Sequence, residues 1–266
     1  MISSIYIRNL SQMFSIIDLV AVCDTRREAA EARAKEFGIP RAMTLDEVAA
    51  DPEVELVVNL TPAFAHYDVI KRMLLAGKHV YTEKMFTTDL DKSRELVALA
   101  AEKGLYLGVA PDTVLGAGIQ SARGIIEAGM IGEVTSVLAA INRDQVLNSE
   151  FFRFLRGSGG ALPYDVGIYY VGAVLALLGP VSEISAFGNP APLHAPQVAY
   201  LNEGAEPWQI PGLNVMTASL RFVSGAVGAV LFDGNTVAQP QHVFTVYGTR
   251  GILKVGDPTT SATPSP

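Results

Sequence analysis

Residues 55–84 read ELVVNLTPAFAHYDVIKRMLLAGKHVYTEK and hold two short apolar runs on either side of an amphipathic segment. The two runs, Glu55–Leu60 and Lys78–Thr82, contain β-branched and aromatic residues of the kind that favour strands. Between them, apolar side chains recur at helical spacing over residues 69–74, and Gly77 supplies a helix stop. Strands that are apolar along most of their length and alternate with helices predict a parallel sheet covered on both faces.

The same alternation continues on both sides of this stretch. Upstream, Asp18–Cys23 predicts a strand, and Thr25–Glu28 has the spacing of a capping box before an alanine-rich helix that ends at Gly38. Downstream, Thr88–Lys103 predicts a helix and Leu105–Ala110 a strand. Right-handed crossovers make such a sheet doubly wound, of the Rossmann type. The residues of the last helix that we expect to face inward are Leu90, Val97 and Ala100.

The sequence after residue 110 follows a different pattern. A helix near Gly116–Ala128 and a strand at Val134–Asn142 precede a glycine-rich turn and a helix around Asp165–Leu178. Strands without intervening helices follow, which indicates an α+β domain with a largely antiparallel open sheet. We therefore expect one domain over residues 1–110 and a second over residues 111–266. The strands expected in the second domain lie at 214–223, 226–232, 242–247 and 252–255.

Composition excludes several classes of protein. The 266 residues carry a formal net charge of −7 without a basic cluster, which argues against binding to nucleic acid or to an anionic membrane surface. The longest apolar run, Val166–Leu178, is shorter than the roughly 20 residues that span a bilayer. A single cysteine, Cys23, excludes a disulfide framework, and with no ligand spacing among the histidines no metal site is expected. These features are compatible with a cytoplasmic protein.

Asp24 directly follows a predicted strand and precedes a helix. In dinucleotide-binding domains an acidic residue at this place accepts hydrogen bonds from the adenosine ribose, which favours NAD over NADP. Arg26 and Arg27 weaken that preference because either could pair with a 2′-phosphate, and Asp24 could instead be only a helix cap. The glycine-rich phosphate loop belongs about 20 residues earlier, near Met1–Ser4, and is absent there. We therefore expect the first strand and the glycine loop of this domain to lie outside the sequence.

Four segments resemble motifs of the Gfo/Idh/MocA oxidoreductase family. Ala76–Lys84 resembles its AGKHVxxEKP segment, and Asn59–His66 is similar to its TPxxxH segment. Gly159–Tyr169 resembles the GGGxxxDxGxH/Y segment, and Gly248–Gly251 the GTxG turn. The segments occur in family order and cover most of the chain, so the combination is more specific than any one of them.

The resemblance implies an NAD(P)-binding domain and a second domain whose sheet often forms a dimer face, and hence a homo-oligomer. It implies hydride transfer between nicotinamide and a hydroxyl or carbonyl carbon of a sugar, an inositol or a related polyol. Lys84 and Tyr169 would be the catalytic pair, with Asp165 beside them. The residues that the resemblance assigns to the cofactor site are Asp24, Thr25, Arg26, Thr61, Pro62, His66, Glu83 and Lys84.

Proton transfer from an alcohol gives these residues their expected roles. The reference pKa of tyrosine, near 10, is too high for a base at neutral pH, and a neighbouring ammonium lowers it. Tyr169 would therefore move the proton, and Lys84 would activate it and hold the substrate. Structural alternatives remain for each residue: core packing for Tyr169, a solvated charge for Lys84, a helix cap for Asp165, and capping or packing for His66.

The chain also departs from the family pattern. Met85 stands where proline normally follows the lysine, and Tyr169 stands where many members have histidine, although the tyrosine form occurs in sugar and dihydrodiol branches. The family usually continues well beyond the GTxG turn, so the second domain is expected to be incomplete. The alternatives to an active enzyme are a dinucleotide-binding regulator without catalysis and an inactive fragment with weak cofactor affinity and poor solubility.

Overall fold

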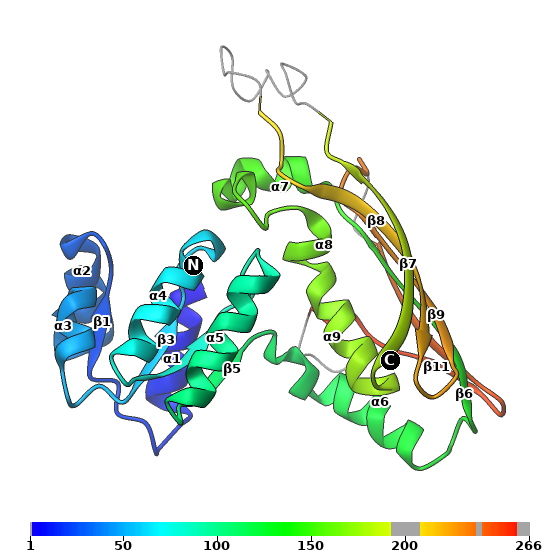
Figure 1. The fold of residues 1–266 in the computed structure, drawn as a ribbon, viewed down its shortest axis with the longest axis horizontal. Coiled ribbons are helices and arrows are strands. Elements are labelled where there is room, and N and C mark those ends of the chain that lie inside the picture. Colours follow the sequence, from blue (N-terminus) through cyan, green and yellow to red (C-terminus); the bar gives the residue numbers. More distant parts are fainter. Residues whose placement is uncertain (1, 193–207, 238–240, 260–266) are drawn as a thin grey trace. The chain divides into compact units, whose positions relative to one another are not determined.

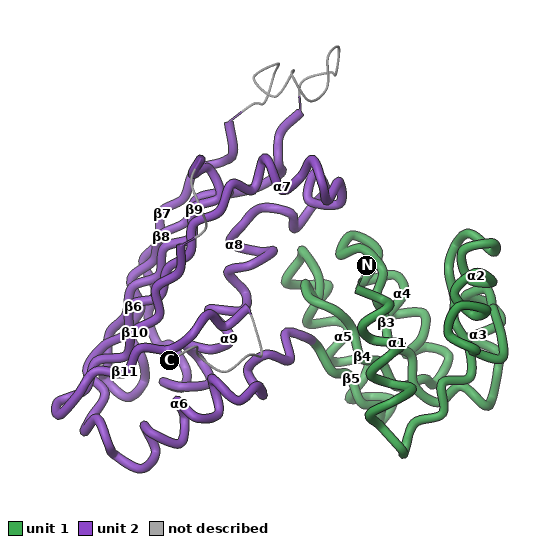
Figure 2. Tube along the Cα trace, turned by 180° about the vertical axis from the view of Figure 1, so that it is seen from behind, with its two compact units in different colours: residues 1–109 green, residues 110–266 purple. Residues whose placement is uncertain are grey.

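The computed structural model describes residues 2–192, 208–237 and 241–259. The chain forms two compact units, Met1–Val109 and Ala110–Pro266 (Figure 2). No helix in the described parts of the chain is long and apolar enough to cross a membrane.

The first unit alternates helices with short parallel strands, which confirms the predicted fold class. β3 pairs with β4 and β4 with β5, whereas β1 pairs with β2 in a separate sheet. The predicted elements all occur, with ends shifted by one to three residues, and β2 and α3 were not predicted. The elements are α1 (Ile2–Gln12), β1 (Ala21–Cys23), α2 (Arg27–Phe37), β2 (Arg41–Met43), α3 (Leu45–Ala50), β3 (Leu56–Asn59), α4 (Ala63–Leu75), β4 (His79–Thr82), α5 (Leu90–Glu102) and β5 (Leu107–Val109).

The parallel strands fall into two groups, β2-β1 and β3-β4-β5. In the usual order of a doubly wound dinucleotide-binding sheet, 3-2-1-4-5-6, one strand lies between two such groups. Among the described residues, no strand pairs with β1 on one side and with β3 on the other. The first unit therefore has the two halves of a doubly wound sheet without the strand that joins them.

Helix packing in the first unit follows the predicted periodicity for α4 but not for α5. Ile70 and Leu74 on α4 are fully buried, as predicted. On α5 the buried residues are Leu96 and Ala100, whereas Leu90, expected to face inward, is 64% exposed. Val97, the other residue expected inside, is 57% exposed. The residues of α5 that face inward are Leu96 and Ala100, which are spaced i, i+4. Leu90 lies in the first turn, beyond the packed part of the helix.

The capping box lies on a different helix from the one predicted. Helix α2 begins after Arg26, which makes no side-chain cap, because Asp24 accepts the Arg26 N–H at 2.9 Å and delays the helix start. A capping box does occur at α3, where the Thr44 hydroxyl accepts the Glu47 N–H and the Glu47 carboxylate accepts the Thr44 N–H. The hydrogen bond from the Thr44 N–H to the carboxylate lowers the pKa of Glu47, and the Thr44 side chain lowers it further.

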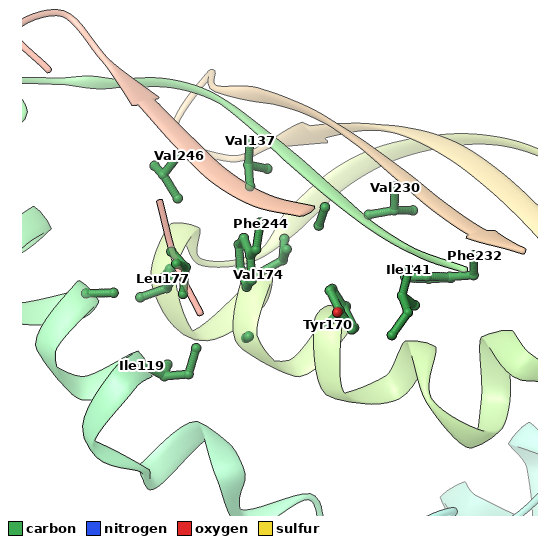
Figure 3. Packing of buried hydrophobic residues seen from close by; sticks show 14 of the residues in the cluster. Ile119, Val137, Ile141, Tyr170, Val174, Leu177, Val230, Phe232, Phe244 and Val246 are labelled. Atoms are coloured by element: carbon green, nitrogen blue, oxygen red, sulfur yellow. The ribbon is translucent and has the colours of Figure 1, made fainter. Parts of the chain in front are cut away.

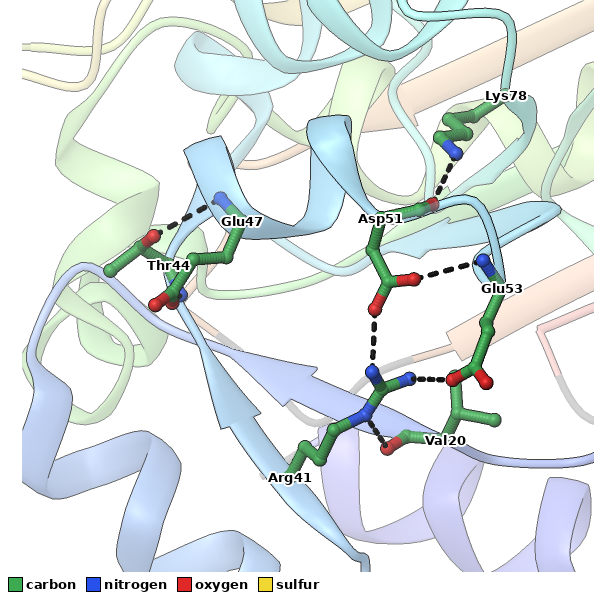
Figure 4. A network of polar contacts seen from close by, with 7 residues as sticks. All are labelled: Val20, Arg41, Thr44, Glu47, Asp51, Glu53 and Lys78. Atoms are coloured by element: carbon green, nitrogen blue, oxygen red, sulfur yellow. Dashed lines mark hydrogen bonds and ion pairs between the residues drawn. The ribbon is translucent and has the colours of Figure 1, made fainter.

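A polar network joins β2 to the connection between α3 and β3 (Figure 4). The Arg41 guanidinium pairs with the carboxylate of Asp51 at 2.6 Å and with that of Glu53 at 3.1 Å, and it donates to the Val20 carbonyl at 3.4 Å. The Lys78 ammonium donates to the Asp51 carbonyl at 2.6 Å. These contacts fix the turn that leads into β3 and β4, whose carboxyl ends carry predicted site residues.

The second unit is a six-stranded sheet with helices on one face (Figure 1). The strand order is β11-β10-β6-β9-β8-β7, and every pair is antiparallel except β6 with β9, which confirms a largely antiparallel sheet. Its longer elements are α6 (Ala117–Glu127), β6 (Val134–Asn142), α7 (Gln145–Phe151), α8 (Leu162–Asp165), α9 (Gly167–Leu178), β7 (Val181–Pro190), β8 (Leu213–Phe222), β9 (Val227–Asp233), β10 (Gln241–Gly248) and β11 (Ile252–Lys254). Two 3-10 turns, η1 (Asp112–Leu115) and η2 (Arg153–Arg156), complete the unit.

The core of the second unit lies between α9 and the sheet (Figure 3). Tyr170 of α9 is fully buried, with its ring 6.0 Å from that of Phe232 and 6.2 Å from that of Phe244. Burial raises the pKa of Tyr170, and its hydroxyl donates to Asp257 at 3.3 Å. This packing anchors α9, the helix that also carries Tyr169.

Candidate functional site

The carboxyl ends of β3 and β4 meet at one edge of the parallel sheet, because Asn59 pairs with Thr82 in parallel register. Asn59 is buried, donates from Nδ2 to the Thr82 hydroxyl at 3.1 Å, and accepts the Thr61 hydroxyl at 2.8 Å. The Thr61 N–H also donates to Asn59 Oδ1, at 3.2 Å. Asn59 therefore fixes Thr61, a predicted cofactor residue, next to the end of β4. The sequence reasoning missed this role, although a polar residue that ends an apolar strand was the available signal.

Glu83 follows β4 directly and is held at both carboxylate oxygens. The Tyr6 hydroxyl donates to Oε1 at 2.8 Å, and the Lys84 N–H donates to Oε2 at 2.9 Å. Burial of the phenol, and then its hydrogen bond to Glu83, raise the pKa of Tyr6. The contact ties α1 to the edge of the sheet, so Tyr6 is a second supporting residue that sequence reasoning missed.

The His66 ring is fully buried at the start of α4 and lies between two main-chain carbonyls. Nδ1 is 2.5 Å from the Met85 oxygen, and Nε2 is 2.7 Å from the Thr61 oxygen. Carbonyl oxygens only accept hydrogen bonds, so the ring nitrogen that carries a proton donates to the carbonyl it faces. His66 thus bridges the segments that follow β3 and β4, and its ring nitrogens are engaged by the main chain. The peptide bond between Lys84 and Met85 is cis.

The other predicted cofactor residues lie on the surface of the first unit. Asp24 follows β1 with an exposed side chain, and its carboxylate lies 3.9 Å from the Arg26 guanidinium. Thr25 and Arg26 are exposed, and Pro62, also exposed, precedes α4 as its N-cap. Lys84 is half-buried beside Glu83. The structure therefore places the predicted residues after β1, β3 and β4, where ligands of parallel sheets bind.

These residues fit part of a dinucleotide. An exposed carboxylate after β1 suits a ribose diol, and the polar groups after β3 and β4 suit an amide-bearing ring and its ribose. The described residues up to Phe37 contain no glycine, so no glycine-rich turn for a pyrophosphate occurs among them.

In the second unit, Asp165 and Tyr169 lie within one short segment. Asp165 is the last residue of α8, and its Oδ2 accepts from Gln145 Nε2 at 3.1 Å. It does not cap α9, whose N-cap is Val166 without a side-chain hydrogen bond, so the capping alternative is wrong. Tyr169, in the first turn of α9, packs against the core and remains partly exposed.

Comparison with known proteins identifies the family of both units. Residues 1–110 match the model of an oxidoreductase family with an NAD-binding Rossmann fold, and residues 119–254 match the GFO/IDH/MocA C-terminal domain. The structure is similar to that of the WlbA dehydrogenase from Bordetella pertussis, solved with NADH and UDP-GlcNAcA. The TM-score is 0.80 and the identity 25%, over 96% of this chain and 74% of that one.

Two relatives illustrate the range of sequence similarity. An uncharacterized oxidoreductase of Schizosaccharomyces pombe is 32% identical over 171 residues, 64% of this chain and 46% of the relative. The trans-1,2-dihydrobenzene-1,2-diol dehydrogenase of Bos taurus is 27% identical over 248 residues, 92% of this chain and 68% of that enzyme. The chain thus spans about half the length of the first of these relatives. On the match of both of its units, the chain belongs to the GFO/IDH/MocA oxidoreductase family.

Proposed function

We propose that the protein transfers a hydride between a nicotinamide cofactor and the carbinol or carbonyl carbon of a small polyhydroxylated molecule, such as a sugar or an inositol. The observation that carries this proposal is the polar edge of the NAD-binding fold, where Asn59, Tyr6 and His66 fix Thr61 and Glu83 next to Lys84. Two similar proteins support the substrate class: one is named as a diol dehydrogenase and the other was solved with a nucleotide sugar.

NAD is the cofactor that the side chains favour, because the Asp24 carboxylate would repel a 2′-phosphate. Arg26 lies 3.9 Å from that carboxylate and leaves NADP as the alternative. Asp24, Thr61 and Glu83 would contact the cofactor, and Lys84 would lie beside the reacting end. The bound cofactor supplies the hydride acceptor or donor.

The proton follows a path through this chain's own side chains. As the substrate hydroxyl is oxidised, Tyr169 takes its proton, and in the reverse direction Tyr169 returns the proton to the carbonyl oxygen. The Lys84 ammonium stabilises the phenolate and binds the same substrate oxygen. Asp165, at the end of α8 and just before the helix that carries Tyr169, accepts a hydrogen bond from a second substrate hydroxyl and orients the sugar ring.

We also propose that two copies associate through the sheet of the second unit. Side chains that alternate with core residues such as Ala139 and Val230 point to the opposite face, which no described helix covers. That face carries exposed apolar side chains on four strands, β7, β6, β9 and β10, and a second copy would bury them. Its exposed apolar residues include Phe187, Leu138, Val227, Leu231 and Val243.

Sedimentation velocity tests the association. Leu231→Glu should convert dimers to monomers, because a carboxylate would be buried without a partner. Leu90→Glu is the matched control, since Leu90 is an exposed leucine of the first unit. Equal sedimentation of Leu231→Glu and the wild type as dimers would contradict this interface.

Nicotinamide absorbance with a panel of sugars and polyols tests the chemistry. Tyr169→Phe should lower turnover by about 100-fold or more without weakening NAD binding. Unchanged turnover in Tyr169→Phe would rule out the assigned proton transfer. Tight NAD binding without turnover on any polyol would instead favour a dinucleotide-binding regulator.

A further inference from the structure

A buried side-chain amide contacts the segment that carries the proposed substrate residues. Gln145, the first residue of α7, is fully buried, and its Nε2 donates to the Gly160 carbonyl at 2.9 Å and to Asp165 Oδ2 at 3.1 Å. Its Oε1 is buried without a hydrogen-bond partner among the described residues. A flipped amide would set that oxygen against two acceptors, so the two donors fix the orientation of the side chain.

A second buried amide holds the same segment from the sheet. Asn214 of β8 is fully buried, accepts the Leu162 N–H at 3.0 Å, and donates to Asn235 Oδ1 at 2.7 Å. The main chains of the two residues are linked through Gly234, whose N–H donates to the Asn214 carbonyl at 2.8 Å and whose carbonyl accepts the Gln145 N–H at 3.1 Å. Residues 160–165 are therefore held at both ends by one connected network.

Close packing leaves this segment little room to shift. A Cβ at Gly160 would lie 1.9 Å from the Leu155 carbonyl oxygen, so only glycine fits there. The Gly160 carbonyl in turn accepts from Gln145. The main chain before Asp165 is thus fixed, and the Gln145 amide, through its other N–H, fixes the Asp165 carboxylate itself.

We propose that Gln145 is a positioning residue that orients the Asp165 carboxylate for the substrate. The inference rests on the proposed function, in which Asp165 binds a substrate hydroxyl. An N–H donor on one carboxylate oxygen restricts rotation of the group. Removal of a supporting residue of this kind typically lowers activity by about 10- to 100-fold.

Four variants test the role. Gln145→Met keeps the length of the side chain and removes both donors, and Ser149→Ala is the control, since Ser149 is a fully buried residue of the same helix that bonds the Val146 carbonyl. Asp165→Ala and the double variant with Gln145→Met complete a cycle. We expect Gln145→Met to lower kcat/KM by about 10- to 100-fold and Ser149→Ala to leave it unchanged. In the Asp165→Ala background, Gln145→Met should cause no further loss.

The melting temperatures of the same variants test the contact without reference to catalysis. The decrease in Tm of the double variant should be smaller than the sum of the two single decreases, because the Gln145–Asp165 hydrogen bond is lost only once. Additive decreases, or wild-type kcat/KM in a folded Gln145→Met, would overturn the inference. If the wild type turns over no polyol, the proposed function fails and the Tm cycle alone decides whether Gln145 holds Asp165.

Discussion

Removal of one hydroxyl group, by Tyr6→Phe, tests the support of Glu83. The Tyr6 hydroxyl is 2.8 Å from Glu83 Oε1, and the Lys84 N–H donates to Oε2 of the same carboxylate at 2.9 Å. The variant keeps the ring, which lies 6.4 Å from that of Tyr81, and loses the hydroxyl, which also forms a hydrogen bond with Tyr81. The largest part of the expected loss is that of the hydrogen bond to the charged Glu83 acceptor.

A hydrogen bond to a charged group contributes about 1.5–3 kcal/mol. Because Tyr6 and Glu83 are both half-buried, solvent screening places the value near the lower limit, at about 1.5 kcal/mol. For a unit of about 100 residues, this corresponds to a decrease in Tm of roughly 6–12 °C. Urea unfolding followed by circular dichroism measures the loss, and the m-value should not change.

The pH dependence has a defined sign. The folded state raises the pKa of Tyr6 above the value of about 10 in the unfolded chain, so its stabilisation is complete below pH ~10 and is lost as the pH rises further. Tyr6→Phe should therefore lose less stability than the wild type as the pH rises above about 10. Tyr106→Phe is the control, because Tyr106 is 81% exposed. The reasoning would be refuted if Tyr6→Phe were as stable as the wild type at neutral pH and lost as much stability as the wild type at alkaline pH.

Three further changes test other parts of the account. Asn59→Ala removes three hydrogen bonds at the ends of β3 and β4 and should lower the free energy of unfolding, measured with urea, by about 3 kcal/mol. Asn59→Asp keeps the acceptor for Thr61 and should lower it clearly less. Equal decreases for the two variants would contradict the assigned hydrogen bonds. Leu96→Ala leaves a cavity under α5 and should lower the free energy of unfolding by about 2–5 kcal/mol. Leu90→Ala, at the exposed start of the helix, should change it little. A larger decrease for Leu90→Ala than for Leu96→Ala would show that the helix packs by its predicted face. Thr44→Ala removes the hydroxyl that accepts the Glu47 N–H and that, after the Thr44 N–H, lowers the pKa of Glu47. Its destabilisation should be largest at neutral pH and should fall, without vanishing, below about pH 4 as Glu47 becomes protonated in both proteins. A loss that does not fall at all would contradict the contact of the hydroxyl with the Glu47 carboxylate.

Periodicity in the sequence predicted the elements that bury one continuous face. Ile70 and Leu74 recur at helical spacing and are fully buried, and β6, whose core and outer residues alternate, was predicted with its observed ends. Strand β7 was not predicted, because Val181–Pro190 is almost wholly exposed and lacks the alternation that burial imposes. Short β2 was missed for a related reason: three residues are too few to show a period.

The candidate site was predictable only in part. Motifs led to the proposal of Glu83, Asp165 and Tyr169 as site residues, because those residues stand in recognisable segments. The residues that support them, Tyr6 and Gln145, come from helices 77 and 20 residues away in the chain, and their contacts depend on packing that no local pattern encodes. The same limit explains why the capping box predicted at the start of α2 does not form. Asp24 accepts the Arg26 N–H there, and this contact cannot be read from the local sequence pattern.

A crystal structure of the protein with NAD and a polyol that it turns over tests the central claim most directly. The account predicts that Lys84 Nζ and Tyr169 Oη both lie within hydrogen-bond distance of one substrate oxygen, with Asp165 on a neighbouring hydroxyl. A complex in which these two side chains occupy separate regions, or in which the substrate oxygen contacts neither, would contradict it.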